Sequence, residues 1–420
     1  MIRLLAFMFC ILCCCLTSLA QSVPVYLYFA SHNETNDQSF HGLNYNTPTD
    51  YALMRAHVRR VCDTLLAHGA PYDMMLESNF ILGCLKNENA AVSGNDLIEW
   101  VSQQPGFSVQ PHNHFKPFGV GANPYNYADL VYLLDSCGVD TAQVMGGFIW
   151  RDFTNPVAVS EDWTDWQTPR PGFTFPQVRW RPTLLWGGGS PNHIDDFSAF
   201  GVWKPTAATQ AGFGQHDSDQ MLINFGNGCG DDFVLWDTTN AYQLAYRIMN
   251  FADSVQAYFS GDPDAFFNQK VMMNFRHFPA AGYAEKLGLV LRLIQPYIDN
   301  GKIRFSGIME TWESWKTLHP DPEQSFVLRC EDGVTVSSVK PLLTTTAVKE
   351  VETRTIVWPN PASESICFQP TVKRLSLLDV WGKLVMEVSE ETTCVDITGL
   401  TPGVYFYRSE LGNGKIVVQR

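Results

Sequence analysis

Beyond its first 20 residues the sequence lacks any long apolar run, so we expect no transmembrane helix in that part of the chain. Basic residues are also scarce, since 29 Lys and Arg stand against 43 Asp and Glu, giving a formal net charge of −14. This balance argues against nucleic acid as a partner, because phosphates require basic patches. The 420 residues, 45% hydrophobic and 17% charged, suffice for one large globular domain and a smaller one.

Paired cysteines at zinc-binding spacing are absent after residue 20, which argues against a structural zinc motif of the CxxC type. The cysteines of that region are odd in number, so a complete disulfide framework is excluded. Individual bridges stay possible in an exported chain. Whether Cys367 pairs with Cys394 is left open by the sequence.

The N-terminus has the composition of a secretory signal peptide. Arg3 precedes an apolar stretch, and Ser18-Leu19-Ala20 forms a small-x-small cleavage pattern before Gln21. We therefore predict a signal peptide at 1–20 and export of the remaining chain.

Residues 21–320 alternate between short apolar strands and amphipathic helices. VPVYLYFA at 23–30 is typical of a buried strand, and DYALMRAHVRRVCDTLLAHG at 50–69 is typical of a helix. YDMMLES and FSVQPH are further strand candidates with helical spacing between them. This order predicts an α/β fold with a parallel sheet, either open or closed into a barrel.

The last part of the chain is predicted to contain strands only. Residues 321–356 lose helical periodicity and are interpreted as a linker or domain edge, and residues 357–420 are predicted to form a small immunoglobulin-like β-sandwich. Four segments there, WPNPASESICF, LLDVWGKLV, DITGLTPGVYFY and GKIVVQR, resemble the type A C-terminal sorting domain of Bacteroidetes type IX secretion substrates. The resemblance implies export through the periplasm and outer membrane by the type IX machinery, and a secreted or cell-surface protein.

Two pairs of candidate metal ligands follow predicted strands. Side chains at i and i+2 of a strand share one face, so His112 and His114 point the same way, as do His32 and Glu34. Histidine nitrogens and a carboxylate are ligands that zinc accepts, so the two pairs predict a site of three or four ligands. Asp37 is a spare carboxylate nearby, and His277 ends a later strand, where it is a candidate proton donor.

Acidic and aromatic residues provide further candidates. Glu77 and Glu310 stand at predicted strand ends, and Glu310 is interpreted either as a general acid or base or as a cap of the last helix. Long loops between Gly147 and Pro205 are rich in tryptophan, whose flat faces suit sugar rings and equally fill cores. The candidate substrate-binding residues there are Trp150, Trp186 and Trp203.

A second resemblance concerns the large domain. VYLYFASHNE, FSVQPHNHF and EKLGLVLRLIQPYIDNGKIRFSGIMETWESW resemble the polysaccharide-deacetylase-like superfamily, although Thr-Phe-Asp-Asp is missing and His112-Asn113-His114 replaces the usual His-x-x-x-His. The resemblance implies a distorted parallel (β/α) barrel of about seven strands. It also implies that Glu34 or Asp37 serves as the acidic ligand and base, with His277 as the late histidine.

These observations predict an exported metal-dependent hydrolase, most similar to a deacetylase, that acts on a glycan. A divalent ion, most plausibly zinc, would be held by His112, His114 and His32 or Glu34. Two alternatives stay open. One is a glycoside hydrolase with Glu34 and Glu310 as paired carboxylates, and the other is a catalytically inactive glycan-binding protein of the cell surface.

Overall fold

The computed structural model divides into two compact units, Met1–Pro341 and Leu342–Arg420. The structure describes residues 23–33, 44–88, 96–115, 117–118, 122–148, 163–187, 199–207, 210–226, 228, 233–321, 323–329, 356–358, 362–379, 383–409 and 412–419. The predicted signal peptide lies outside these residues, as do Glu34, Asp37 and Trp150. In the described part of the chain, no helix has both the length and the apolarity needed to cross a membrane.

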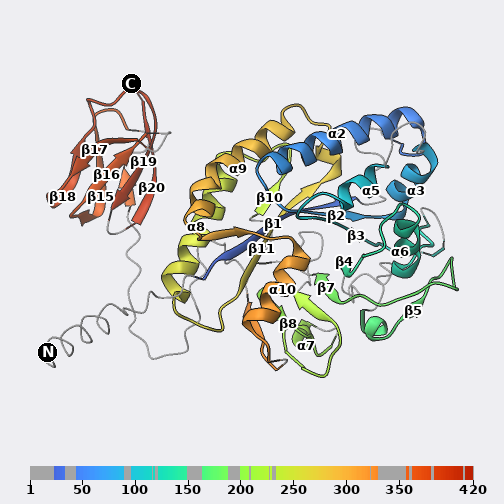
Figure 1. Ribbon diagram of the computed structural model, residues 1–420. Helices are drawn as coiled ribbons and strands as arrows, with labels where there is room; N and C mark the ends of the chain where they lie inside the picture. The colour runs from blue at the N-terminus through green and yellow to red at the C-terminus, as the bar shows by residue number, and fades with distance from the viewer. Residues whose placement is uncertain are drawn as a thin grey trace, which may run out of the picture. The chain divides into compact units, whose positions relative to one another are not determined.

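A parallel sheet forms the centre of the first unit, with its strands in the order β10-β11-β1-β2-β3 (Figure 1). Its members are β1 (Val25–Asn33), β2 (Tyr72–Leu76), β3 (Phe107–Pro111), β10 (Val234–Leu235) and β11 (Phe267–Asn274), with β12 (Ile303–Phe305) beside the start of β1. β1 is buried along its whole length, as expected for a central strand covered on both faces. It extends three residues beyond the predicted end because it continues to pair with β2.

Helices cover one face of this sheet, where Figure 1 shows α2, α8 and α9 side by side. The main helices are α2 (Pro48–Ala67), α3 (Ser78–Asn87), α5 (Leu97–Ser102), α6 (Tyr127–Asp135), α8 (Ala241–Phe259), α9 (Tyr283–Asp299) and α10 (Ile308–Leu318). Thr47 caps α2 by accepting from the Asp50 amide, and Pro48 occupies its first turn. Val25, Leu27 and Phe29 of β1 belong to the core that α2, α8 and α9 share with the sheet, whereas α10 packs on the other face of β1.

A second sheet has the order β13-β8-β9-β7-β4. It consists of β4 (Val144–Phe148), β7 (Leu184–Gly187), β8 (Ala199–Trp203), β9 (Ile223–Phe225) and β13 (Phe326–Arg329). β4, β7 and β9 are parallel, whereas β8 runs antiparallel to both of its neighbours. Short elements accompany this sheet: η2 (Trp163–Gln167), β5 (Arg170–Pro171), β6 (Arg179–Trp180) and α7 (Gln210–Phe213).

The inner faces of the two sheets share a second core. Tyr26, Tyr28 and Ala30, on the face of β1 opposite the helices, pack there with Trp186 and Phe225 of the second sheet. Because successive inward residues of a strand are two positions apart, His32 is the next side chain on this face. Its ring lies edge-on to Trp186, with 5.1 Å between the ring centroids.

The α/β architecture with a parallel sheet agrees with the predicted fold, but closure into a barrel is not shown. An isolated parallel bridge between His112 and Gly146 joins β3 to β4. At the opposite edges, no strand ladder among the described residues joins the two sheets. The parallel series stops there because β8 enters the second sheet in the antiparallel direction.

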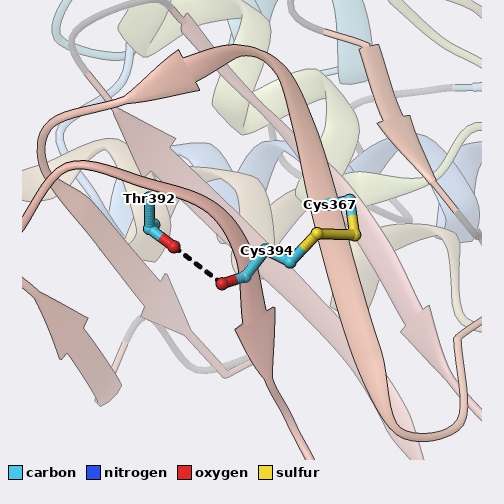
Figure 2. Close-up of a disulfide and its surroundings, with 3 residues drawn as sticks. All are labelled: Cys367, Thr392 and Cys394. Carbon is cyan, nitrogen blue, oxygen red and sulfur yellow. Dashed lines mark hydrogen bonds between the residues drawn. A yellow bond between two sulfur atoms is a disulfide. The ribbon is translucent and has the colours of Figure 1, made fainter.

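The second unit is all-β. One sheet contains β14 (Ile356–Trp358), β15 (Ser365–Val372) and β18 (Thr392–Asp396), and the other contains β16 (Leu375–Leu378), β17 (Leu384–Val388), β19 (Gly403–Ser409) and β20 (Gly412–Val418). The two sheets share one hydrophobic core that includes Ile366, Phe368 and Ile416. Cys367 and Cys394 stand opposite each other on β15 and β18 and form a disulfide (Figure 2). The bridge that the sequence left open is therefore present.

Candidate metal centre

Three neighbouring parallel strands end in metal-ligating side chains at the same edge of the first sheet. His32 lies in β1, Glu77 directly follows β2, and His112 directly follows β3. The ladder continues through these positions, since the Glu77 amide donates to Asn33 O at 3.2 Å and the His112 amide to Leu76 O at 2.9 Å. The strand order β1-β2-β3 therefore brings the three side chains to one place.

The donor atoms of Glu77, His112 and His114 converge. One ligand atom from each lies within 4.8 Å of the other two, and the Nε2 atoms of the histidines are 3.2 Å apart. A tetrahedral zinc ion with Zn–N bonds of about 2.0–2.1 Å holds its nitrogen ligands about 3.3 Å apart. The residues present therefore fit a zinc ion.

His32 is the fourth side chain of the cluster and contacts His112. Its ring stacks on that of His112, with 4.1 Å between centroids and 30° between planes. His32, Glu77 and His112 are buried, whereas His114 is partly exposed. The cluster is therefore closed toward the core and accessible on the side of His114.

Glu77 also organises the backbone around the site. It stands at the N-cap position of α3, and its Oε1 accepts a hydrogen bond from the His114 amide at 3.1 Å. Asn123 donates to His114 O at 3.4 Å and accepts from Ser78 Oγ at 3.0 Å. Such outer contacts orient the ligands of a metal site.

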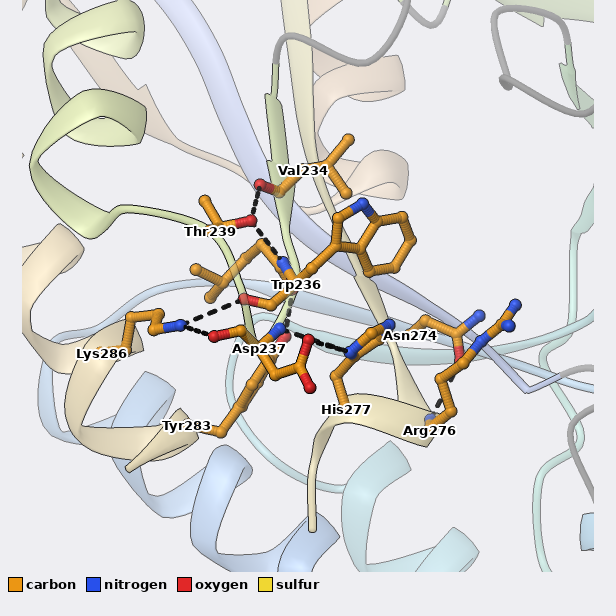
Figure 3. Close-up of polar contacts among 10 residues, drawn as sticks. Val234, Trp236, Asp237, Thr239, Asn274, Arg276, His277, Tyr283 and Lys286 are labelled. Atoms are coloured by element: carbon orange, nitrogen blue, oxygen red, sulfur yellow. Dashed lines mark hydrogen bonds and ion pairs between the residues drawn. The ribbon is translucent and has the colours of Figure 1, made fainter. Parts of the chain in front are cut away.

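A second pair of polar side chains lies at the same edge, after β10 and β11 (Figure 3). His277 ends the short turn η4 (Phe275–His277), and its Nδ1 lies 2.9 Å from Asp237 Oδ1. The indole ring of Trp236 covers the imidazole at 4.8 Å between centroids. Lys286 of α9 donates to the carbonyls of Trp236 and Asp237, which fixes this loop against the helix.

The pair and the cluster lie along adjacent strands. β11 pairs with β1 in a register that sets Asn274 opposite His32, and His277 follows Asn274 by three residues. The candidate groups therefore line one edge of the sheet from β10 to β3, the edge where parallel α/β folds place their active sites.

Asp73 is a buried acid on the inner face of β2, four residues before Glu77. Its Oδ1 accepts from Ser108 Oγ, and its Oδ2 accepts from the Ile308 amide at the start of α10, at 3.2 Å. Burial raises the pKa of Asp73 to about 7, against the lowering effect of these two hydrogen bonds and with a small further increase from Glu310.

The other predicted residues that the structure describes are Glu310, Trp186 and Trp203, and of these Trp186 contacts the cluster. Glu310 is exposed in the first turn of α10, the position that the helix-capping interpretation predicts. Trp186 is buried against His32, and Lys270 Nζ lies 3.8 Å from the centre of its ring. Trp203 is also buried, and its indole NH donates to Phe213 O at 2.5 Å. These two rings therefore act as packing groups.

Two residues of the site are not assigned to it by the sequence analysis. Glu77 was recognised as an acid at a strand end but was not assigned to the metal, and Asp237 was not singled out. Each is the first acidic residue after a strand of the parallel sheet, at the edge where the histidines gather. That position is the signal that identifies both.

Comparison with known families concerns mainly the second unit. Residues 356–419 match the family described as the secretion system C-terminal sorting domain. The tail is a sorting domain. The predicted resemblance is thus confirmed, and the sorting domain indicates export and a secreted or surface location.

Distant likenesses to solved structures cover 71% of the chain. No curated protein matches the chain at a significant level. Among solved structures, a protein of Pseudomonas aeruginosa PAO1 described as a probable polysaccharide deacetylase is 11% identical at a TM-score of 0.42, and PuuE allantoinase is 10% identical at 0.42. Each alignment covers 71% of this chain and 93% of the other. At these TM-scores the likeness carries no argument about function, which must come from the site.

Proposed function

We propose that the first unit is an exported metal-dependent hydrolase that removes acyl groups from a glycan. The convergence of Glu77, His112 and His114 at the ends of neighbouring strands carries this proposal. Three protein ligands leave a coordination position for water, the arrangement typical of catalytic rather than structural zinc. Predicted export places such an enzyme where extracellular glycans are available.

The residues of the site divide the chemistry between them. A divalent ion bound by the cluster supplies Lewis acidity and lowers the pKa of a water molecule. Glu77 holds the His114 backbone in place, and His32 packs against His112 to fix its ring. His277 protonates the leaving nitrogen or oxygen, while Asp237 fixes the orientation of its imidazole through Nδ1.

A carboxylate is still needed to remove a proton from water. Glu34 directly follows β1, and Asp37 lies three residues further along the chain. Both lie outside the described residues and keep the role of base that the sequence assigns to them. In this proposal the acidic metal ligand is Glu77 and not Glu34. His32 is assigned a supporting position beside the metal.

The decisive experiment measures metal and activity together. The purified chain is expected to carry one divalent ion at this site and to release acetate from acetylated glycans. The double variant His112→Ala, His114→Ala should lose both, whereas His68→Ala should lose neither, because His68 ends α2 at the opposite edge of the sheet. Acetate release that persists in the double variant would refute the proposal.

Glycan binding without catalysis has one observation in its favour. A cavity of about 340 Å³ lies at the end of the second sheet where β9 begins. Its walls include Trp203, Trp312 and Trp315. This candidate predicts that Trp312→Ala weakens glycan binding, measured by calorimetry. It also predicts that a chelator and the double histidine variant leave binding unchanged.

A further inference from the structure

A second group of metal-ligating side chains lies among the helices that cover the sheet. Cys84, Asp96 and Cys137 each place one ligand atom within 4.8 Å of the other two. Cys84 belongs to α3, Asp96 is the N-cap residue of α5, and Cys137 follows the end of α6. The three donors therefore come from three different helices.

The three side chains contact one another at the edge of the helical core. Both cysteines are fully buried, at 0% and 2% exposure, whereas Asp96 is half-buried. Asp96 caps α5 through Oδ1, which accepts from the Glu99 amide at 2.8 Å. The Cys84 side chain also contacts the side chains of both Asp96 and Cys137.

The charges around the group favour a cation. Cys84, Cys137 and Asp96 each become anionic on ionisation. Nearby Glu88 adds negative charge, while its own oxygens accept from Tyr51, Arg55 and the Leu97 amide. A bound divalent cation would stabilise thiolate and carboxylate together.

We propose that Cys84, Cys137 and Asp96 form a second metal site that binds a thiophilic divalent ion such as zinc. Tetrahedral zinc with Zn–S bonds of about 2.3 Å holds its sulfur ligands about 3.8 Å apart, within the observed limit of 4.8 Å. A disulfide between the two thiols would leave Asp96 with its helix cap and its contact with Cys84 alone, whereas a metal ion would use all three groups.

The position of this site suggests what it does. α3 begins directly after Glu77 and contains Cys84, so one helix joins the two metal sites. α5 leads into β3, which ends at His112. A metal ion that ties α3 to α5 and α6 therefore fixes the two strand ends on which Glu77 and His112 stand. This proposal does not depend on the enzymatic one.

Cobalt distinguishes the two sites, because only thiolate ligands produce an intense sulfur-to-cobalt charge-transfer band in the near ultraviolet. The full chain, freed of metal and loaded with Co²⁺ under reducing conditions, is expected to show this band. The variant His112→Ala, His114→Ala should keep the band at full intensity. Cys84→Ser combined with Cys137→Ser should abolish it, and Cys62→Ala, which removes another buried cysteine outside the group, should leave it unchanged.

A conservative variant distinguishes loss of the metal site from loss of the fold. Asp96→Asn keeps an oxygen to cap α5 and should retain the circular dichroism of the wild type while binding cobalt at least roughly tenfold more weakly. The proposal is overturned if the wild type shows no band, if the band survives Cys84→Ser with Cys137→Ser, or if peptide mapping finds a Cys84–Cys137 disulfide in the purified chain.

Discussion

Asp73 should make the stability of the first unit depend on pH. Its carboxyl is fully buried, and its pKa is raised from 3.8 to about 7 because burial disfavours the charged form. Between these two values the unfolded chain releases a proton that the folded chain retains, so the free energy of unfolding falls as pH rises. The contribution of Asp73 is therefore complete below pH 3.8 and is lost as pH approaches and passes 7.

The magnitude follows from the gap between the two values. One pKa unit corresponds to about 1.4 kcal/mol, so the wild type should lose up to about 4 kcal/mol between pH 4 and pH 8 through this residue. Asp73→Asn should not suffer this loss, because its amide is neutral. It also keeps an oxygen for the Ile308 amide and gains an NH₂ for Ser108 Oγ.

Urea unfolding monitored by tryptophan fluorescence at several pH values measures the effect. Chelator should be present throughout, so that proton competition at metal ligands does not contribute. The two proteins should be similar near pH 4, and the variant should be the more stable by up to about 4 kcal/mol at pH 8. Stabilities that change in parallel with pH would show that Asp73 is not a buried neutral acid.

Three further predictions concern separate parts of the chain. Glu77→Gln, which keeps an oxygen for the His114 amide, should weaken zinc binding at least roughly tenfold by competition titration, and unchanged affinity would remove Glu77 from the ligand set. Asp237→Asn should lower kcat of the proposed deacetylation roughly tenfold or more at unchanged metal content, since it removes the carboxylate that contacts His277 Nδ1 and lies outside the metal ligands. Replacing Cys367 and Cys394 by serine should destabilise the sorting domain by about 3–4 kcal/mol in urea unfolding. The disulfide joins residues 27 apart in the sequence, and about this much free energy corresponds to the entropy that such a cross-link removes from the unfolded chain. Equal stability of the two proteins would contradict the prediction.

The parts of the site that sequence could predict rest on local periodicity. The spacing of His112 and His114 predicts that they share one face, and their Nε2 atoms do lie 3.2 Å apart, although both residues follow β3 and are not part of it. Polar residues after apolar strands mark the functional edge of a parallel sheet. The contact of His32 with His112 follows from these two rules. The sorting domain was predictable for another reason, since its four motifs occur together and in order.

The remaining residues depend on packing that local patterns do not specify. β10 has only two residues, which are too few to predict a strand from the sequence. Asp237 could therefore not be recognised as a residue that follows a strand. Closure of a barrel depends on how β8 enters the second sheet, which the sequence between Gly147 and Pro205 does not indicate. Cys84 and Cys137 meet through the packing of α3 near α6, far from each other in the chain.

β2 shows why position, more than residue type, decides the role of an acid in this fold. Asp73 lies in β2 and Glu77 directly follows it, and both side chains are fully buried. Asp73 meets a hydroxyl and an amide in the middle of the sheet, which leaves its charge uncompensated and favours the protonated form. Glu77 lies four residues further along the chain, just beyond the strand, where two histidine nitrogens face each other at a spacing suited to a metal ion. A step of four residues therefore separates a structural acid from a candidate ligand.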